Sequence, residues 1–202
     1  LTQSGSIYEP KYDGIRALVH VASGKTRPDV RIWSRLGNDK TGQFPSLANA
    51  LAPLAASLKH PVLLDGEIVA LDEAGRPAGF QRLQGRIHLK GTRDVERLDA
   101  TQPAALIVFD ILRDGDEDLR GLPLTERRAR LEALVKRVLS DTLRLSEQVA
   151  GDARALDARA RREGWEGIIA KDARSPYHSG RRSPAWRKIK LLQQQEFVIG
   201  GW

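Results

Sequence analysis

Apolar runs in the first third of the chain predict β-strands separated by turns. The runs are Ile7–Lys11, Ile15–Val21 and Val30–Ser34, and the turn-forming segment Gly24–Asp29 separates the last two. Asp13-Gly14 stands between the first two runs, and Asp-Gly between apolar runs is a strong hairpin signal. We therefore expect the first two strands to pair as a hairpin.

The next part of the chain predicts a short helix followed by more strands. Leucine and alanine repeat at helical spacing over Leu47–Leu58, and Pro53 must kink or divide that helix. The apolar run Val62–Leu71 predicts a strand. A second Asp-Gly, Asp65-Gly66, interrupts this run, and the turn-rich segment Asp72–Gly79 follows it, so we expect another strand pair.

The remainder mixes strands with amphipathic helices, which indicates the α+β class. Phe80–Ile87 has the length of one or two helical turns, and Ala104–Leu112, apolar except for Asp110, predicts a buried strand. Two amphipathic helices are predicted over Arg127–Val138 and Asp152–Glu163. Three strands are predicted to close the chain, over Gly167–Lys171, Trp186–Leu191 and Phe197–Ile199.

The amino-acid composition excludes several kinds of catalytic and metal site. The 202 residues contain no cysteine and four histidines, so thiolate nucleophiles and cysteine-based zinc sites are excluded, and a bound metal would have oxygen ligands. No apolar run reaches the length of a membrane span, and no signal-peptide pattern opens the chain. The net charge of +7 favours phosphate-bearing partners. Because methionine is absent and the chain begins at Leu1, we expect it to be one domain of a longer polypeptide.

Lys11 ends a predicted strand within Glu9-Pro10-Lys11-Tyr12-Asp13-Gly14-Ile15-Arg16. The segment is either a hairpin with solvated charges or the site of a nucleophilic lysine. An amine attacks phosphorus or carbonyl carbon only when it is deprotonated. The second interpretation therefore requires burial or nearby cations that lower the lysine pKa from about 10.4.

A group of cations lies near the end of the chain. A strand over Trp186–Lys190 would point Trp186, Lys188 and Lys190 to one face, which suits a grip on phosphate or pyrophosphate. The alternative is a solvated basic edge strand that blocks aggregation. The basic residues, with no acidic residue among them, are Arg174, Arg181, Arg182, Arg187, Lys188 and Lys190.

Glu67 and Glu166 are carboxylates among residues that favour burial. An isolated buried carboxylate is costly, so each needs an arginine, a ribose hydroxyl or a divalent cation, or else forms a structural salt bridge. Phe109-Asp110 has two interpretations as well. Either a base-binding pocket lies beside the phenylalanine, or the pair is a core phenylalanine followed by a surface aspartate.

In this order the segments resemble the nucleotidyltransferase core of ATP-dependent DNA ligases, a family that shares its fold with RNA ligases and mRNA capping enzymes. The resemblance extends from Glu9 to about Gly201, and the ending Glu196–Trp202 is most similar to bacterial ligases of the end-joining type. The six matching motifs are Lys11-Tyr12-Asp13-Gly14-Ile15-Arg16, Ser34-Arg35, Asp65-Gly66-Glu67, Phe109-Asp110, Glu166-Gly167-Ile168-Ile169-Ala170-Lys171 and Trp186-Arg187-Lys188-Ile189-Lys190.

The resemblance implies an α+β nucleotidyltransferase fold, similar to ATP-grasp, with mainly antiparallel sheets flanked by helices over residues 1–202. It implies that Lys11 attacks the α-phosphate of ATP and holds AMP as a phosphoramidate while pyrophosphate leaves. Glu9 would read the adenine edge, and Phe109 would stack on the base. The other implied contacts are Arg16 and Glu67 to ribose, Lys171, Lys188 and Lys190 to the phosphates, Glu67 and Glu166 to a divalent metal, and Arg35, Arg181 and Arg182 to DNA.

The cofactors implied by the resemblance are ATP, as covalent AMP on Lys11, and Mg²⁺ or Mn²⁺. The implied partner is nicked duplex DNA, sealed during DNA repair or end joining by a monomer in the bacterial cytoplasm, at the nucleoid, without a membrane. Arginines on the helix Asp152–Glu163 are expected to extend the DNA surface. Ligases of this family carry an oligonucleotide-binding-fold domain after the last motif, so we expect the isolated core to take up AMP less well and to seal nicks poorly.

Alternative functions stay open at this point. An RNA ligase or a capping guanylyltransferase shares the Lys-x-Asp-Gly pattern, and labelling with ATP against GTP separates the capping enzyme from the others. A basic nucleic-acid-binding module with an inert lysine motif is a further alternative. It would bind DNA in a salt-sensitive way without forming an AMP adduct.

Overall fold

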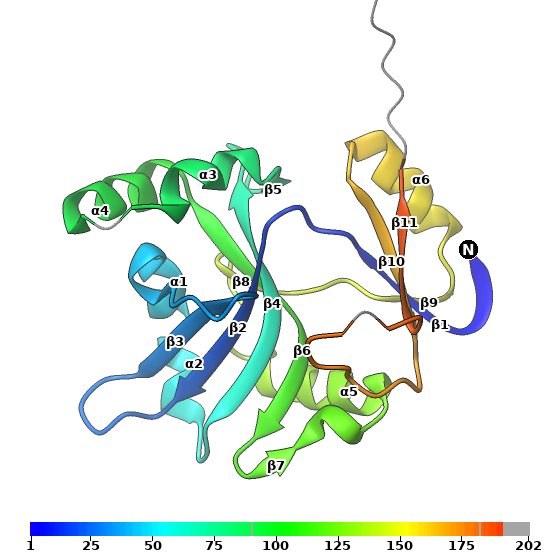
Figure 1. The fold of residues 1–202 in the computed structure, drawn as a ribbon, viewed down its shortest axis with the longest axis horizontal. Coiled ribbons are helices and arrows are strands. Elements are labelled where there is room, and N and C mark those ends of the chain that lie inside the picture. Colours follow the sequence, from blue (N-terminus) through cyan, green and yellow to red (C-terminus); the bar gives the residue numbers. More distant parts are fainter. Residues whose placement is uncertain (90, 182, 192–202) are drawn as a thin grey trace, which may run out of the picture.

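Two β-sheets lie side by side in the computed structural model, which describes residues 1–89, 91–181 and 183–191 (Figure 1). The large sheet has the strand order β3-β2-β4-β6-β7, with β5 beside β4 and β8 parallel to β6. Its strands are β2 (Ile15–Ala22), β3 (Asp29–Ser34), β4 (Val62–Leu71), β5 (Pro77–Ala78), β6 (Ala104–Asp114), β7 (Glu117–Asp118) and β8 (Leu143–Leu145).

The small sheet is fully antiparallel and has the order β11-β10-β1-β9. It combines the start of the chain with three strands from its last third. These strands are β1 (Thr2–Pro10), β9 (Val149–Asp152), β10 (Gly167–Asp172) and β11 (Trp186–Lys190).

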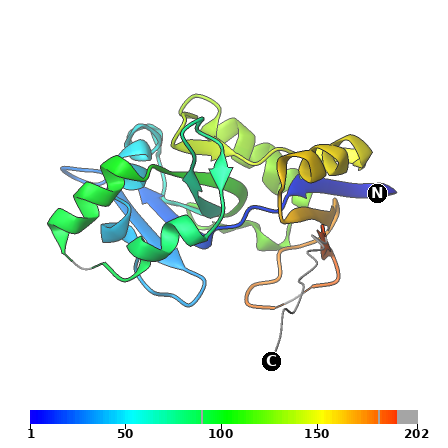
Figure 2. The same ribbon diagram turned by 90° about the horizontal axis from the view of Figure 1, so that it is seen from above.

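Helices flank both sheets, and α4 and α6 lie at opposite ends of the molecule (Figure 2). Leu47, Leu54 and Leu131 of α1, α2 and α5 belong to the core of the large sheet, whereas Leu156 and Ala160 of α6 pack in a separate core against the small sheet. The helical segments are η1 (Thr41–Gln43), α1 (Pro45–Ala50), α2 (Ala52–Ser57), α3 (Gln81–Ile87), α4 (Thr92–Thr101), η2 (Leu119–Gly121), α5 (Leu124–Val135) and α6 (Arg154–Glu163).

The predicted α+β class, with antiparallel sheets flanked by helices, is confirmed. The helix containing Pro53 is divided into α1 and α2, as expected. Helices α5 and α6 lie within two or three residues of their predicted positions. The sequence patterns missed α4, β8 and β9, and the predicted strand Phe197–Ile199 lies outside the described residues. Among the described residues, none of the helices has the length and apolar character needed to cross a membrane.

The hairpin predicted at Asp13-Gly14 is wrong. Strand β1 pairs with β9 and β10, whereas β2 pairs with β3 and β4, so Asp13-Gly14 carries the chain from one sheet to the other. A Cβ at Gly14 would lie 2.1 Å from the Ile68 carbonyl oxygen, and the Asp13 carboxylate accepts a hydrogen bond from the Phe80 amide at 3.0 Å. Glycine is required here by close packing against β4.

The strand break predicted at Asp65-Gly66 is also wrong, because β4 continues through it. The pairing register with β6 shifts between these two residues, and a Cβ at Gly66 would lie 2.8 Å from the Ile107 carbonyl oxygen. Glycine therefore allows close approach of β6 rather than a turn.

Candidate active site

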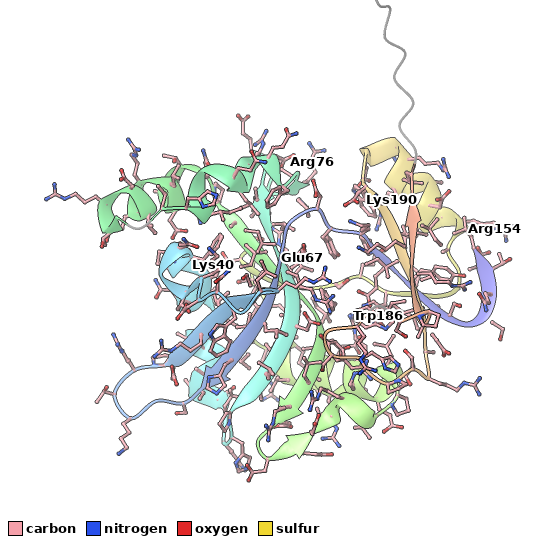
Figure 3. All side chains as sticks on the ribbon, in the orientation of Figure 1. Lys40, Glu67, Arg76, Arg154, Trp186 and Lys190 are labelled. Atoms are coloured by element: carbon pink, nitrogen blue, oxygen red, sulfur yellow. The ribbon has the colours of Figure 1, made fainter. Side chains whose placement is uncertain are left out.

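A cavity of about 660 Å³ lies between the two sheets, and both sheets contribute to its walls. Figure 3 shows Glu67 of β4 near the middle of the molecule, with Trp186 and Lys190 on β11 across from it. The cavity brings together most of the residues singled out from the sequence. They are Glu9, Lys11, Arg16, Arg35, Glu67, Phe109, Lys171 and Lys188.

Lys11 follows the last residue of β1 and is tied to the small sheet, since its amide donates to the Gly167 carbonyl at 2.9 Å. A Cβ at Gly167 would lie 2.1 Å from the Ile189 carbonyl oxygen, so glycine lets β11 approach β10 at this point. The Lys11 ammonium forms a salt bridge with Glu166, the residue before β10. This salt bridge has to open before Lys11 can act as a nucleophile.

Glu9 lies at the buried end of the cavity with its carboxylate surrounded by donors. Lys171 Nζ donates to Oε1 at 2.7 Å, and the Glu9 and Lys171 side chains are only 2% and 1% exposed. Gln148 Nε2 donates to Oε1 at 2.8 Å, and Ser146 Oγ donates to Oε2 at 2.9 Å. The sequence resemblance implied a phosphate contact for Lys171. In the structure its charge is paired with Glu9, and the phosphate contact stays a prediction.

Two aromatic rings lie beside this buried pair. Phe109 of β6 and Trp186 of β11 meet edge to face with centroids 6.2 Å apart. Lys171 Nζ lies 4.7 Å from the Phe109 centroid and 4.1 Å from the Trp186 centroid. The Phe109 ring is nearly buried yet belongs to the cavity wall, so it offers an apolar surface of the kind on which a base stacks.

Asp110, the residue after Phe109, is fully buried, which corrects the interpretation of a surface aspartate. It accepts two hydrogen bonds from Arg127 of α5, at 2.8 and 2.9 Å. Burial raises the pKa of Asp110, and the Arg127 guanidinium opposes that shift. Arg127 also donates to the Ser175 carbonyl at 3.2 Å, so α5 holds both the Phe109 strand and the segment that follows β10.

Arg16 is held in a cluster that joins the large sheet to the segment between β10 and β11. Its guanidinium donates to Asp65 of β4 at 3.1 and 2.6 Å and to the Tyr177 hydroxyl at 3.2 Å. The Tyr177 hydroxyl in turn donates to Asp65 at 2.7 Å. Burial raises the pKa of Tyr177, and the Asp65 carboxylate adds to the shift, so the hydroxyl remains a donor.

Glu67 faces the same cavity from β4. Burial raises its pKa to about 7, although the Arg16 and Lys11 cations favour the charged form. The Gly14 backbone N–H also favours the charged form and so opposes the rise in the pKa of Glu67. Glu67 and Glu166 therefore both lie near Lys11. Within the described ranges, the structure has no group of three or more acidic, histidine or cysteine side chains that could hold a metal ion by themselves.

A second cavity, of about 710 Å³, adjoins the first and shares Arg16, Arg35, Trp186 and Lys188 with it. Arg181 and Lys190 add two more cations to its lining. The predicted face of Trp186, Lys188 and Lys190 is thereby confirmed. Arg182, which the sequence grouped with them, lies outside the described residues.

The arginines of α6 are arranged differently from those of the second cavity. Arg154, Arg159 and Arg161 each form a salt bridge with an acidic side chain, namely Asp152, Glu147 and Asp157. These ion pairs largely balance the charges of the three arginines, and the expected extension of the DNA surface over α6 stays a prediction.

Sequence reasoning missed three residues of the site: Ser146, Gln148 and Tyr177. Ser146 and Gln148 belong to the connection between the short strands β8 and β9, which carries no apolar period long enough to be recognised. Tyr177 stands in an irregular segment rich in proline, serine and arginine. A lone tyrosine among basic residues was the only available signal.

Comparison with known proteins agrees with the resemblance found in the sequence. Residues 1–190 match the family model for the ATP dependent DNA ligase domain. The multifunctional non-homologous end joining protein LigD of Pseudomonas aeruginosa is 41% identical over 195 residues, which cover 96% of this chain and 21% of that protein. A probable DNA ligase of Streptomyces griseus is 36% identical over 200 residues, covering 95% of this chain and 37% of the relative.

Solved structures show the same relationship. The ligase domain of M. tuberculosis LigD superimposes with a TM-score of 0.72 at 36% identity, over 92% of this chain and 54% of that one. A mycobacterial DNA ligase D complexed with ATP and MES gives a TM-score of 0.69 at 33% identity, with coverage of 92% and 54%. These matches confirm the predicted ligase nucleotidyltransferase fold. The chain spans between about a fifth and two fifths of the curated relatives described above.

Proposed function

Because the chain belongs to the ATP-dependent DNA ligase family, we propose that it is the adenylation domain of a DNA ligase and that Lys11 becomes covalently linked to AMP. The observation that carries this proposal is the position of Lys11. It lies in a cavity that also holds an aromatic pair and a buried carboxylate, and this cavity shares Trp186 and Lys188 with a strongly basic second cavity. A nucleoside triphosphate needs the same kinds of partner, for its planar base, its sugar and its anionic tail.

The base and sugar have suitable partners. Phe109 would stack on adenine, and Glu9 would accept a hydrogen bond from its edge. Arg16 and Glu67 line the same cavity and would contact the ribose hydroxyls. A Glu67 pKa near neutral lets that side chain either donate or accept a hydrogen bond.

In the first step the neutral Lys11 amine attacks the α-phosphorus of ATP. A nitrogen–phosphorus bond forms, the bond to the bridging oxygen breaks, pyrophosphate leaves with the electron pair, and the amine loses a proton. Phosphoryl transfer depends mainly on positioning and charge neutralisation. Lys188 and Lys190 would supply that charge from β11. Lys171 is committed to Glu9 and would act at the base rather than at the phosphates.

A divalent metal, Mg²⁺ or Mn²⁺, fits the chemistry of the two carboxylates beside Lys11. Glu166 and Glu67 offer oxygen ligands, and phosphate oxygens and water would complete the coordination. The ion would supply neutralisation of phosphate charge. Engagement of Glu166 with a metal would also remove the partner that holds the Lys11 ammonium.

The later steps involve DNA. An oxygen of a 5′-phosphate at a nick attacks the phosphorus of the lysyl-AMP, which releases Lys11, and the 3′-hydroxyl then attacks the activated 5′-phosphate and releases AMP. Arg35 and Arg181 line the second cavity and would contact the DNA phosphates, and Arg182 joins them by sequence. The relatives named LigD suggest a role in DNA repair by end joining, in a bacterial cytoplasm at the nucleoid. We also propose that the domain works as a monomer within a larger protein that has further domains.

Labelling with ATP tests the proposal. Incubation with α-labelled ATP and Mg²⁺ or Mn²⁺ should label the parent chain and should fail to label Lys11→Ala, while Lys25→Ala, an exposed control, labels like the parent. Label chased onto nicked DNA but not onto nicked RNA would separate a DNA ligase from an RNA ligase. Labelling by GTP, or salt-sensitive DNA binding without any label, would overturn the proposal.

A further inference from the structure

Three side chains donate hydrogen bonds to the Glu9 carboxylate. We propose that Ser146 and Gln148 are positioning residues that make the Glu9 carboxylate select a purine with a 6-amino group. Neither residue lines the cavity, so both would act through Glu9. The inference rests on the proposed function, because it concerns the nucleotide that Lys11 would attack.

The carboxylate offers about four acceptor positions, two on each oxygen. Among the described residues, Lys171 and Gln148 donate to Oε1, and Ser146 donates to Oε2. Oε1 is therefore saturated, and one acceptor position stays open on Oε2. Because Glu9 lines the cavity, that remaining position would be the one that a ligand uses.

Ser146, the first of the two positioning residues, is itself held in place. Ser146 is fully buried; its amide donates to the Val108 carbonyl at 2.8 Å, and its own carbonyl accepts from Arg128 Nη2 at 2.7 Å. Val108 precedes Phe109, so the same strand positions the aromatic surface and, through Ser146, the carboxylate. A base stacked on Phe109 would thus meet Glu9 at a fixed place and angle.

One open acceptor next to a stacked base discriminates by the type of group at position 6. A 6-amino group donates to Oε2, whereas a 6-oxo group would place an acceptor against an acceptor in a buried site. If Ser146 or Gln148 loses its donor, a second acceptor position opens and the carboxylate is free to rotate. Adduct formation with ATP should then be faster than with a nucleotide lacking the 6-amino group by a smaller factor than in the parent.

The test compares two nucleotides in each variant. Single-turnover formation of lysyl-AMP is measured with ATP, and the corresponding adduct is measured with purine riboside triphosphate, which lacks the 6-amino group. For Ser146→Ala and Gln148→Met we expect the second-order rate constant for adduct formation with ATP to fall about tenfold. We expect the rate constant for the analogue to change by less than about twofold, because the analogue has no 6-amino group and makes no hydrogen bond from position 6 to Glu9. Glu147→Gln, whose side chain is 44% exposed and pairs with Arg159, is the matched control from the same segment and should keep the parent's preference.

The outcomes separate this inference from the proposed function. A parent chain that takes up no AMP overturns both. If the parent labels and the variants lose the same factor in rate with both nucleotides, Ser146 and Gln148 have a merely structural role. That result overturns this inference alone. Variants that keep the parent's preference for ATP overturn it as well. Thermal unfolding of each variant, followed by circular dichroism, checks that the fold is retained.

Discussion

The proposed base end and the proposed phosphate end of the nucleotide site are built on opposite principles. At the base end, consisting of Glu9, Lys171, Ser146 and Gln148, the charges are buried and paired. At the phosphate end, consisting of Arg35, Arg181, Lys188 and Lys190, the cations are exposed along a second cavity. A buried, paired charge fixes geometry and ties function to stability, whereas an exposed cation attracts phosphate without adding to the stability of the fold.

The largest stability effect is expected at the base end, for Lys171→Met. This change leaves the Glu9 carboxylate buried without its counter-charge and should lower the free energy of unfolding by about 3–5 kcal/mol. Urea unfolding measures the loss. The double variant Glu9→Gln with Lys171→Met removes both charges and should recover most of it. If the unfolding free energy of Lys171→Met alone lies within about 1 kcal/mol of the parent's, Glu9 and Lys171 are not tightly coupled.

A smaller and pH-dependent effect is expected for Glu67→Gln, between the two ends. The folded-state pKa of about 7 lies above the usual 4.5, so folding favours the protonated acid. Stability from this group is fully present below the unfolded pKa and decreases as pH rises towards the folded pKa. The neutral glutamine should therefore be more stable than the parent by roughly 2 kcal/mol at about pH 8, with no gain at about pH 4.5.

Chemical unfolding at the two pH values measures this difference. The exposed Glu73→Gln variant is the control and should track the parent at both. A Glu67→Gln gain that is the same at both pH values would mean that the Glu67 charge is not the cause.

Tyr177→Phe tests how the basic segment between β10 and β11 is attached to the large sheet. Loss of the hydroxyl removes a donor from the buried Asp65 and should cost about 1–2 kcal/mol. Amide hydrogen exchange should accelerate over residues 173–181, where the Tyr177 amide donates to the Arg120 carbonyl. Tyr8→Phe, in the small-sheet core, is the control and should leave this segment unchanged. Unaltered exchange in Tyr177→Phe would show that the hydroxyl does not anchor the segment.

The smallest stability effect is expected at the phosphate end. Arg181→Ala should change the unfolding free energy by less than about 0.5 kcal/mol. It should nevertheless weaken DNA binding and reduce the slope of log affinity against log salt by about 0.9, the value for one phosphate contact. Arg161→Ala on α6 removes an arginine that already pairs with Asp157 and should leave the slope unchanged. Equal losses in both variants would mean that DNA contacts extend over α6.

The sequence predicted the site best where a short motif contains a residue with a specific chemical role. Lys11, Glu67, Phe109 and Lys188 were recognised from short motifs, and the structure brings all four to one cavity. The strands and most helices followed from apolar periodicity, because burial of one face enforces it.

Pairing between distant segments could not be read in the same way. Both Asp-Gly pairs have the local signature of a hairpin, yet the glycines serve close contacts with Ile68 and Ile107, which lie far away in the chain. The family resemblance implied a phosphate contact for Lys171, and only the pairing of β1 with β10 places this residue against Glu9. Ser146 and Gln148 are common polar residues whose role exists only through that carboxylate.

The most direct test of the proposed lysyl-AMP is the intact mass of the protein after incubation with ATP and Mg²⁺ or Mn²⁺. The parent should gain the mass of one AMP and lose it again when pyrophosphate is added, because the phosphoramidate forms reversibly, whereas Lys11→Ala should gain nothing. A parent without the added mass, or a Lys11→Ala variant that carries it, would contradict the assignment of Lys11 as the nucleophile.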